Sequence, residues 1–205
     1  MSKLYVVGIG PGSKDYLTLA SKKAVESSDR VIGSRRALDL FEIQNGIELK
    51  AQNMKEMMEL AVSMVMDGKI VSLLSTGDPG FSGILKPILG LKADINIEVI
   101  PGISSVQLCA AKLKIPWDEA NLITMHGKGI SRDILDIIDN GKPTIILPNF
   151  KPAELANFLI ENSVDPEREV AICEKLSYSD EKVINTSLKS VLEMEFSYMC
   201  VMVVY

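Results

Sequence analysis

Short apolar runs alternate with amphipathic segments along the first half of the chain. Unbroken or two-residue apolar patterns predict strands, and a 3.6-residue period predicts helices. By these criteria we expect strands at residues Lys3–Ile9, Arg30–Gly33, Ile70–Ser75 and Ile97–Ile100. We expect helices at residues Thr18–Ser28, Met54–Val65 and Ile103–Lys114. This alternation predicts an α/β fold, and the unbroken run at 70–75 is typical of a parallel strand buried on both faces.

One of the predicted helices carries a methionine-rich apolar face. Its apolar residues recur at helical spacing, at Met54, Met57, Met58, Ala61, Val62 and Val65. Asn53 precedes this helix and Glu56 follows three residues later, which is the pattern of a capping box. Methionine fills irregular gaps in protein cores, so this face is predicted to pack inside and not to bind a partner.

The pattern changes in the second half of the chain. Strands are expected at residues Leu122–His126, Thr144–Leu147, Glu169–Cys173, Lys182–Thr186 and Met199–Tyr205. A helix is expected at 131–140 and another just after Pro152. The last strands leave little room for helices between them, so hairpins and a mixed sheet are predicted. We expect an N-terminal α/β domain at 1–115, a linker at 116–120 and a C-terminal α/β domain at 121–205.

Composition narrows the class of protein. The chain has 205 residues, 47% of them hydrophobic, and a net charge of −5, which argues against broad nucleic-acid binding. Cys109, Cys173 and Cys200 lack metal-ligand spacing, so we expect reduced, mostly buried thiols. The first residues lead directly into a strand without a signal peptide, and no apolar run is long enough to span a bilayer. These features predict a cytoplasmic protein.

Glycine-bearing turns follow four of the predicted strands. They are Gly8-Ile9-Gly10-Pro11-Gly12, Gly77-Asp78-Pro79, Pro101-Gly102-Ile103-Ser104-Ser105 and His126-Gly127-Lys128. The first turn is not a dinucleotide fingerprint, because the third glycine is missing and Pro11 lacks a backbone N–H. It is not a phosphate loop either, because no Gly-Lys-Ser/Thr ends it. Four such turns at strand ends nevertheless predict a small-molecule site built largely from main chain.

Three side chains in these turns are candidates for chemistry, each with a structural alternative. Asp78 follows a buried strand, where α/β sheets bind ligands, or it forms an Asx turn with its own backbone. Ser104 and Ser105 open a helix whose N–H groups suit a carboxylate, or they only cap it. His126 is the single histidine and is either structural or a base near an acidic substrate.

Taken together, the motifs resemble the tetrapyrrole methylases over essentially the whole chain. The resemblance rests on Gly8-x-Gly-Pro-Gly12, Leu17-Thr18-Leu19-x-Ala, Gly77-Asp78-Pro79 and Pro101-Gly102-Ile103-Ser104-Ser105. It implies two α/β domains with S-adenosylmethionine in the cleft between them, and a homodimer. By similarity, the cofactor-binding residues are Pro11, Thr76, Gly77, Asp78, Phe81, Ser104, Ser105, Leu147 and Leu176. His126 and Asp78 are the catalytic candidates if a proton must be removed.

Within the family, later segments are most similar to the enzymes that methylate carbon 5 of a cobalt-precorrin in cobalamin biosynthesis. These segments are Ile115–Ala120, Met125–Lys128 and Glu174–Glu181. The chain departs from that pattern at Gly80, Lys128 and Ser179, where a bulky apolar residue, arginine and proline are usual. The resemblance implies a cobalt-precorrin substrate, with the decarboxylating C15-methyltransferase on a separate chain. One alternative is a methylase that acts on another precorrin carbon or on the modified histidine of diphthamide synthesis. Another is a non-catalytic carrier of a corrinoid or a nucleoside.

Overall fold

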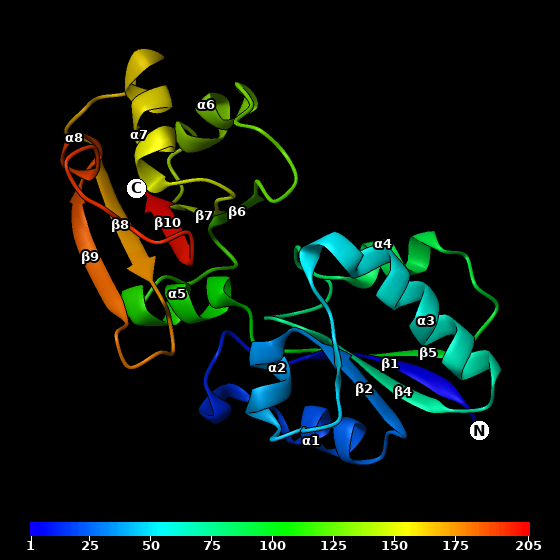
Figure 1. The fold of residues 1–205 in the computed structure, drawn as a ribbon. Coiled ribbons are helices and arrows are strands. Elements are labelled where there is room, and N and C mark those ends of the chain that lie inside the picture. Colours follow the sequence, from blue (N-terminus) through cyan, green and yellow to red (C-terminus); the bar gives the residue numbers. More distant parts are fainter. The chain divides into compact units, whose positions relative to one another are not determined.

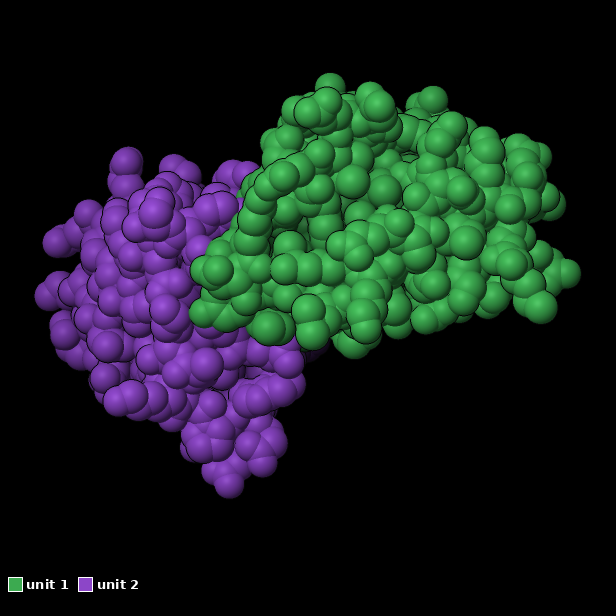
Figure 2. Space-filling view, turned by 90° about the horizontal axis from the view of Figure 1, so that it is seen from below, with its two compact units in different colours: residues 1–104 green, residues 105–205 purple.

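The computed structural model describes residues 1–205, and the chain divides into two compact units, Met1–Ser104 and Ser105–Tyr205 (Figure 2). The division lies at Ser104, whereas the sequence suggested residues 116–120. The helix that follows the Pro101-Gly102 turn therefore belongs to the second unit. No helix in the chain combines the length and the apolar character needed to cross a bilayer.

The first unit is a parallel sheet with helices on both faces, as the alternating pattern predicted (Figure 1). Its strand order is β3-β2-β4-β1-β5, and every pairing is parallel. The strands are β1 (Lys3–Gly8), β2 (Arg30–Gly33), β3 (Ile47–Glu48), β4 (Ile70–Ser75) and β5 (Ile97–Ile100). The helices are α1 (Leu19–Glu26), α2 (Arg35–Leu40), α3 (Met54–Met66) and α4 (Leu85–Gly90). The short strand β3 and helices α2 and α4 lie in segments where no element was predicted.

Two apolar layers hold this sheet. Residues of α3 and α4 pack on one face against Leu4, Val71 and Leu73, and α1 and α2 pack on the other face. Met57 and Met58 are buried in the first layer, which confirms the core assignment of the methionine face. The Asn53 side chain does not cap α3, contrary to expectation. Its Oδ1 instead accepts from the Lys50 backbone N–H at 2.6 Å, because a 3₁₀ turn at Ala51–Asn53 precedes the helix.

The second unit contains the predicted mixed sheet, with strand order β6-β7-β10-β8-β9. Its strands are β6 (Asn121–Thr124), β7 (Thr144–Leu147), β8 (Glu169–Glu174), β9 (Lys182–Ser187) and β10 (Cys200–Val204). Only β6 and β7 pair in parallel; β8 and β9 form the expected antiparallel hairpin, and β10 runs antiparallel to β7 and β8. Its helices are α5 (Ser105–Leu113), α6 (Asp133–Ile138), α7 (Pro152–Glu161) and α8 (Leu188–Val191).

Helices cover both faces of this second sheet as well. Ile138 of α6, Leu155 of α7 and Val191 of α8 join one buried cluster with Ile172 and Met202 of the sheet. Helix α5 lies against the opposite face, below the sheet in Figure 1. Pro152 opens α7 at its first turn, where its missing N–H costs nothing.

Candidate functional site

The ends of three parallel strands in the first unit meet backbone to backbone. A Cβ atom on Gly8 would lie 2.4 Å from Gly102 N, and one on Gly102 would lie 2.2 Å from Gly77 O. Side chains do not fit at such distances, so glycine is required at positions 8 and 102. Gly10 and Gly77 add a two-way bridge, with N···O distances of 3.3 and 2.8 Å. We call Gly8, Gly10, Gly77 and Gly102 the glycine junction.

Asp78 ties two of these loops together. Its Oδ1 accepts from Gly80 N at 2.8 Å, which is the Asx turn given above as the structural alternative. Its Oδ2 accepts from Gly102 N at 3.1 Å, on the loop after β5. Both carboxylate oxygens therefore hold backbone amides in place, and the bond to Gly102 N fixes Asp78 to the glycine junction. A Cβ on Gly80 would lie 3.1 Å from Oδ1, so a bulky residue there would need the turn to adjust.

The other site residues predicted in the first unit lie in the loops beside the glycine junction. Pro11 and Ser104 are buried, Phe81 is half-buried, and Thr76 is exposed. Gly77 has a left-handed φ of 68°, and a Cβ there would meet only Ser104 Cα, at 3.8 Å. Gly77 is thus the member of the junction that leaves open space above its backbone, whereas the space at Gly8 and Gly102 is filled by the chain itself.

The second unit brings its predicted residues to one edge of its own sheet. Strands β6 and β7 are parallel, and β8 runs in the same direction because β10 is antiparallel to both β7 and β8. The carboxyl ends of β6, β7 and β8 therefore share an edge. Leu147 ends β7, Leu176 follows β8 by two residues, and His126 follows β6 by two residues. Ser105 does not follow a strand of this sheet, because it is the first residue of α5.

The loop that carries Leu176 is strained and tightly held. Lys175 and Ser177 adopt left-handed φ values of 49° and 73°, which non-glycine residues rarely do. Glu181 fixes this loop: its Oε2 accepts from Ser177 N at 2.7 Å, and its Oε1 pairs with Lys112 Nζ of α5 at 2.5 Å. Burial favours a raised pKa for the Glu181 carboxyl, but Lys112 and the Ser177 N–H hold the pKa below its usual value. Sequence reasoning missed Glu181, because its partner on α5 is distant along the chain.

A second carboxylate, at the end of β8, is buried. Glu174 is 5% exposed, and its Oε1 accepts from Ser197 N at 2.6 Å. Burial alone would raise the pKa of Glu174, but the bond from Ser197 and the charges of Lys182 and Lys175 lower it. Glu174 therefore stays ionised inside the unit and anchors the segment that leads into β10.

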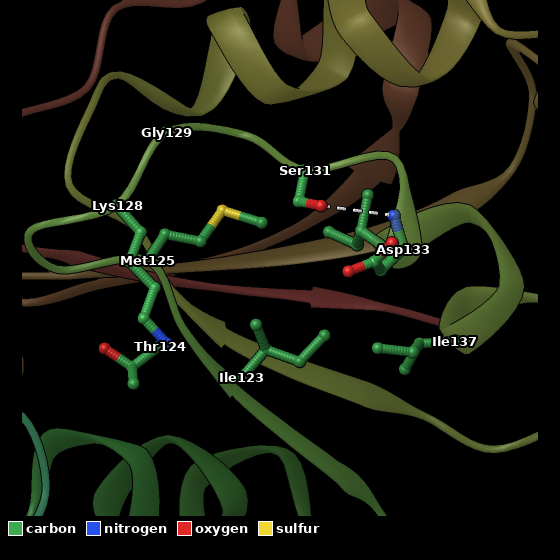
Figure 3. Close-up of a pocket in the computed structure, with 9 residues that line it drawn as sticks. Ile123, Thr124, Met125, Lys128, Gly129, Ser131, Asp133 and Ile137 are labelled. Atoms are coloured by element: carbon green, nitrogen blue, oxygen red, sulfur yellow. Dashed lines mark hydrogen bonds between the residues drawn. The ribbon is translucent and has the colours of Figure 1, made fainter.

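A cavity of about 270 Å³ opens beside the loop that follows β6 (Figure 3). Its apolar lining comes from Ile123, Met125, Ile134 and Ile137, and its polar lining from Thr124, Lys128, Ser131 and Asp133. The Lys128 side chain extends towards Thr124 in Figure 3, and Ser131 Oγ accepts from Asp133 N at 3.4 Å. His126, two residues from Lys128, is exposed and is bonded through its backbone N–H to Thr124 Oγ1. No group of three or more His, Cys, Asp or Glu side chains is arranged to hold a metal ion.

Several known proteins are similar to this chain along nearly its whole length. A probable cobalt-precorrin-7 C(5)-methyltransferase of Methanocaldococcus jannaschii is 45% identical, covering 98% of this chain and 96% of that protein. A crystal structure of precorrin-6Y methylase from Archaeoglobus fulgidus matches with a TM-score of 0.77 at 24% identity, covering 98% of this chain and 96% of that one.

A uroporphyrin-III C-methyltransferase from Thermus thermophilus, crystallised with S-adenosyl homocysteine, has the same fold. It matches with a TM-score of 0.79 at 21% identity, covering 98% of this chain and 91% of that one. The family model of the tetrapyrrole (corrin/porphyrin) methylases matches residues 3–192. That match covers most of both compact units, and the chain therefore belongs to the tetrapyrrole methylase family.

Proposed function

We propose that this protein transfers a methyl group from S-adenosylmethionine to carbon 5 of cobalt-precorrin-7, or of a closely related precorrin, in cobalamin biosynthesis. The observation that carries the proposal is the 45% identity to the probable carbon-5 enzyme of M. jannaschii along nearly the full length of both chains. A cobalt-precorrin-4 C(11)-methyltransferase of the same organism is 29% identical over 93% of this chain and is the weaker candidate.

Two sets of residues are proposed to contact the cofactor. The set on the first unit is Pro11, Thr76, Gly77, Phe81 and Ser104, beside the glycine junction. The set on the second unit is Ser105 with Leu147 and Leu176. They fit S-adenosylmethionine chemically: the open backbone at Gly77 and the serine and threonine hydroxyls suit its polar groups, and the apolar side chains suit its adenine face.

Methyl transfer of this kind depends mainly on positioning. S-adenosylmethionine supplies an electrophilic methyl group when bound. Orientation of two reactants can lower a barrier by about 7–11 kcal/mol, so a site rich in backbone and poor in catalytic side chains suits the reaction. Asp78 contributes by holding Gly80 N and Gly102 N, and is a positioning residue. His126 is exposed at a strand end and is the residue we propose to accept a proton from the substrate, or to orient it.

The substrate side of the site is proposed to include Lys128. A precorrin is a macrocycle with many carboxylate arms, and Lys128 presents an exposed ammonium at a cavity with an apolar floor. A carboxylate arm combines an apolar stem with an anionic end, which matches that lining. Lysine in place of arginine gives a single point charge instead of a bidentate fork, so this contact is predicted to be weakly directional.

The finer biological context is also proposed. We infer a homodimer from the family resemblance. Three free cysteines support the cytoplasm as the compartment. The cobalt ion belongs to the substrate in this proposal and needs no site on the protein.

The proposal is tested by incubating the protein with S-adenosylmethionine and cobalt-precorrin-7 and following the product by mass spectrometry. We expect a gain of one methyl group that requires both substrates. Isothermal titration calorimetry of S-adenosylmethionine alone serves as the control for cofactor binding. Cofactor binding without methylation of cobalt-precorrin-7, but with methylation of cobalt-precorrin-4, would replace the carbon-5 assignment with carbon 11.

A further inference from the structure

Two cysteines far apart in sequence meet inside the second unit. Cys109 on α5 lies 3.3 Å from Cys173 on β8, measured between the two Sγ atoms, and 64 positions separate them in the chain. Both residues are fully buried, at 0% exposure. Neither thiol has a part in the proposed methyl transfer.

The third cysteine is held away from this pair by the pleat of the sheet. Cys200 lies opposite Glu174 in the β10–β8 register, whereas Cys173 lies opposite Val201. Successive side chains of a strand point to opposite faces, so Cys200 and Cys173 face different layers. Cys200 belongs to the cluster with α6, α7 and α8, and Cys173 faces α5. Cys200 is therefore a matched control for the pair.

The electrostatic surroundings distinguish the two thiols. The Cys109 S–H donates to Cys173 Sγ, and this bond lowers the pKa of Cys173 and raises that of Cys109. Burial and Glu181 act against the lowering of the Cys173 pKa, and Lys112 adds to it. Cys173 is thus the better nucleophile of the two.

We propose that Cys109 and Cys173 form an intramolecular dithiol–disulfide site that responds to hydroperoxides and, when oxidised, links α5 to β8. The Cys173 sulfur attacks one oxygen of hydrogen peroxide, the O–O bond breaks, and a sulfenic acid and one water form. The Cys109 sulfur then attacks the sulfenic sulfur, the S–O bond breaks, and the hydroxyl leaves as water with the Cys109 proton. Two thiols lose two electrons in total, and one peroxide becomes two waters.

Formation of the bond needs only a small movement. A disulfide has an S–S length near 2.0 Å, so the two sulfurs must approach by about 1.3 Å from their 3.3 Å separation. Because both sulfurs are buried, the reaction requires transient opening of α5 from the sheet, and it should be slow in the native protein and faster in mild urea. The bond would close a long loop, and longer closed loops restrict the unfolded chain more than short ones, so the disulfide should stabilise the folded protein.

Full-length protein is treated with hydrogen peroxide, quenched and analysed by non-reducing peptide mapping and intact mass spectrometry. We expect a mass loss of about 2 Da, a Cys109–Cys173 linked peptide, and a rise in Tm of about 5–10 °C that dithiothreitol reverses. Cys200→Ala should form the same bond. Cys109→Ala and Cys173→Ala should not.

The inference does not depend on the proposed enzymatic activity, since no readout uses either substrate. It is overturned if the wild type and Cys200→Ala keep all their thiols under peroxide in mild urea. It is equally overturned if the oxidised product carries only sulfinic acids or bonds that involve Cys200.

Discussion

The two units present edges of different construction. The edge of the first unit is made of main chain, where three glycine loops touch at the glycine junction and one carboxylate, Asp78, clamps two of them. The edge of the second unit is held by side chains. Glu181 accepts from Ser177 N in the strained loop and pairs with Lys112, and the buried Glu174 accepts from Ser197 N in the segment before β10. Substitutions of the glycines in the main-chain edge should therefore cost much stability, whereas single substitutions in the side-chain edge should each cost less.

The largest effect should come from the glycine junction. Gly102→Ala places a Cβ 2.2 Å from a backbone oxygen, which the surroundings have no way to relieve without moving a loop. We expect a loss of about 3 kcal/mol in unfolding free energy, measured by urea denaturation. Gly90→Ala is the matched control, because a Cβ there meets nothing within 4 Å, and its stability should change little. Equal stabilities for the two variants would mean that the junction is not close-packed.

The next effect concerns the carboxylate clamp. Asp78→Ala leaves Gly80 N and Gly102 N without their partner, and we expect a loss of about 2 kcal/mol in stability together with weaker S-adenosylmethionine binding by calorimetry. Lys128→Ala should affect cofactor binding less, because its side chain lines a cavity of the second unit. The reverse order of the two variants would contradict the site assigned here.

Acid should weaken the second unit through its buried carboxylate, Glu174. The folded-state pKa of Glu174 lies below the ordinary value of 4.5, so its stabilisation is present above about pH 4.5 and is lost as the pH falls through the folded pKa. Glu174→Gln should flatten this part of the pH–stability curve, by about 1–2 kcal/mol. If the Glu174→Gln variant keeps the wild-type slope of stability against pH below pH 4.5, then other groups are responsible for the loss of stability in acid.

A smaller effect is expected at the loop after β8. Glu181→Ala removes the partner of Ser177 N and Lys112, and we expect a loss of about 1 kcal/mol and a modest rise in the Kd for S-adenosylmethionine. Lys189→Ala breaks an ion pair with Glu167 at 3.7 Å between exposed side chains, and should change neither quantity. If Glu181→Ala and Lys189→Ala give the same stability and the same Kd, then anchoring of the loop after β8 contributes to neither quantity.

The same contrast explains which features were predictable from sequence. Apolar periodicity correctly predicted the parallel sheet of the first unit, the buried face of α3 and the β8–β9 hairpin, because those patterns are local. Glycine motifs marked the loops of the main-chain edge. They did not show that Gly8 and Gly102 serve chain packing while Gly77 is left open, because this depends on contacts between strands.

Other features depend on partners distant in the chain. The pairing of Lys112 with Glu181 and the meeting of Cys109 with Cys173 leave no local sequence signal. Asn53 shows the limit of a capping pattern, since its side chain serves the preceding 3₁₀ turn. The Asp78 motif was local and recognisable, but only the structure showed that Oδ1 forms the Asx turn and that Oδ2 accepts from Gly102 N on another loop.

The most direct measurement uses S-adenosylmethionine labelled with ¹³C in its methyl group. The protein is incubated with it and cobalt-precorrin-7, and the position of the label in the product is read by NMR. Our account predicts a single labelled methyl group on carbon 5. A labelled methyl group on any other carbon would contradict this account. An unlabelled product would also contradict it, provided that calorimetry shows that the protein binds the cofactor.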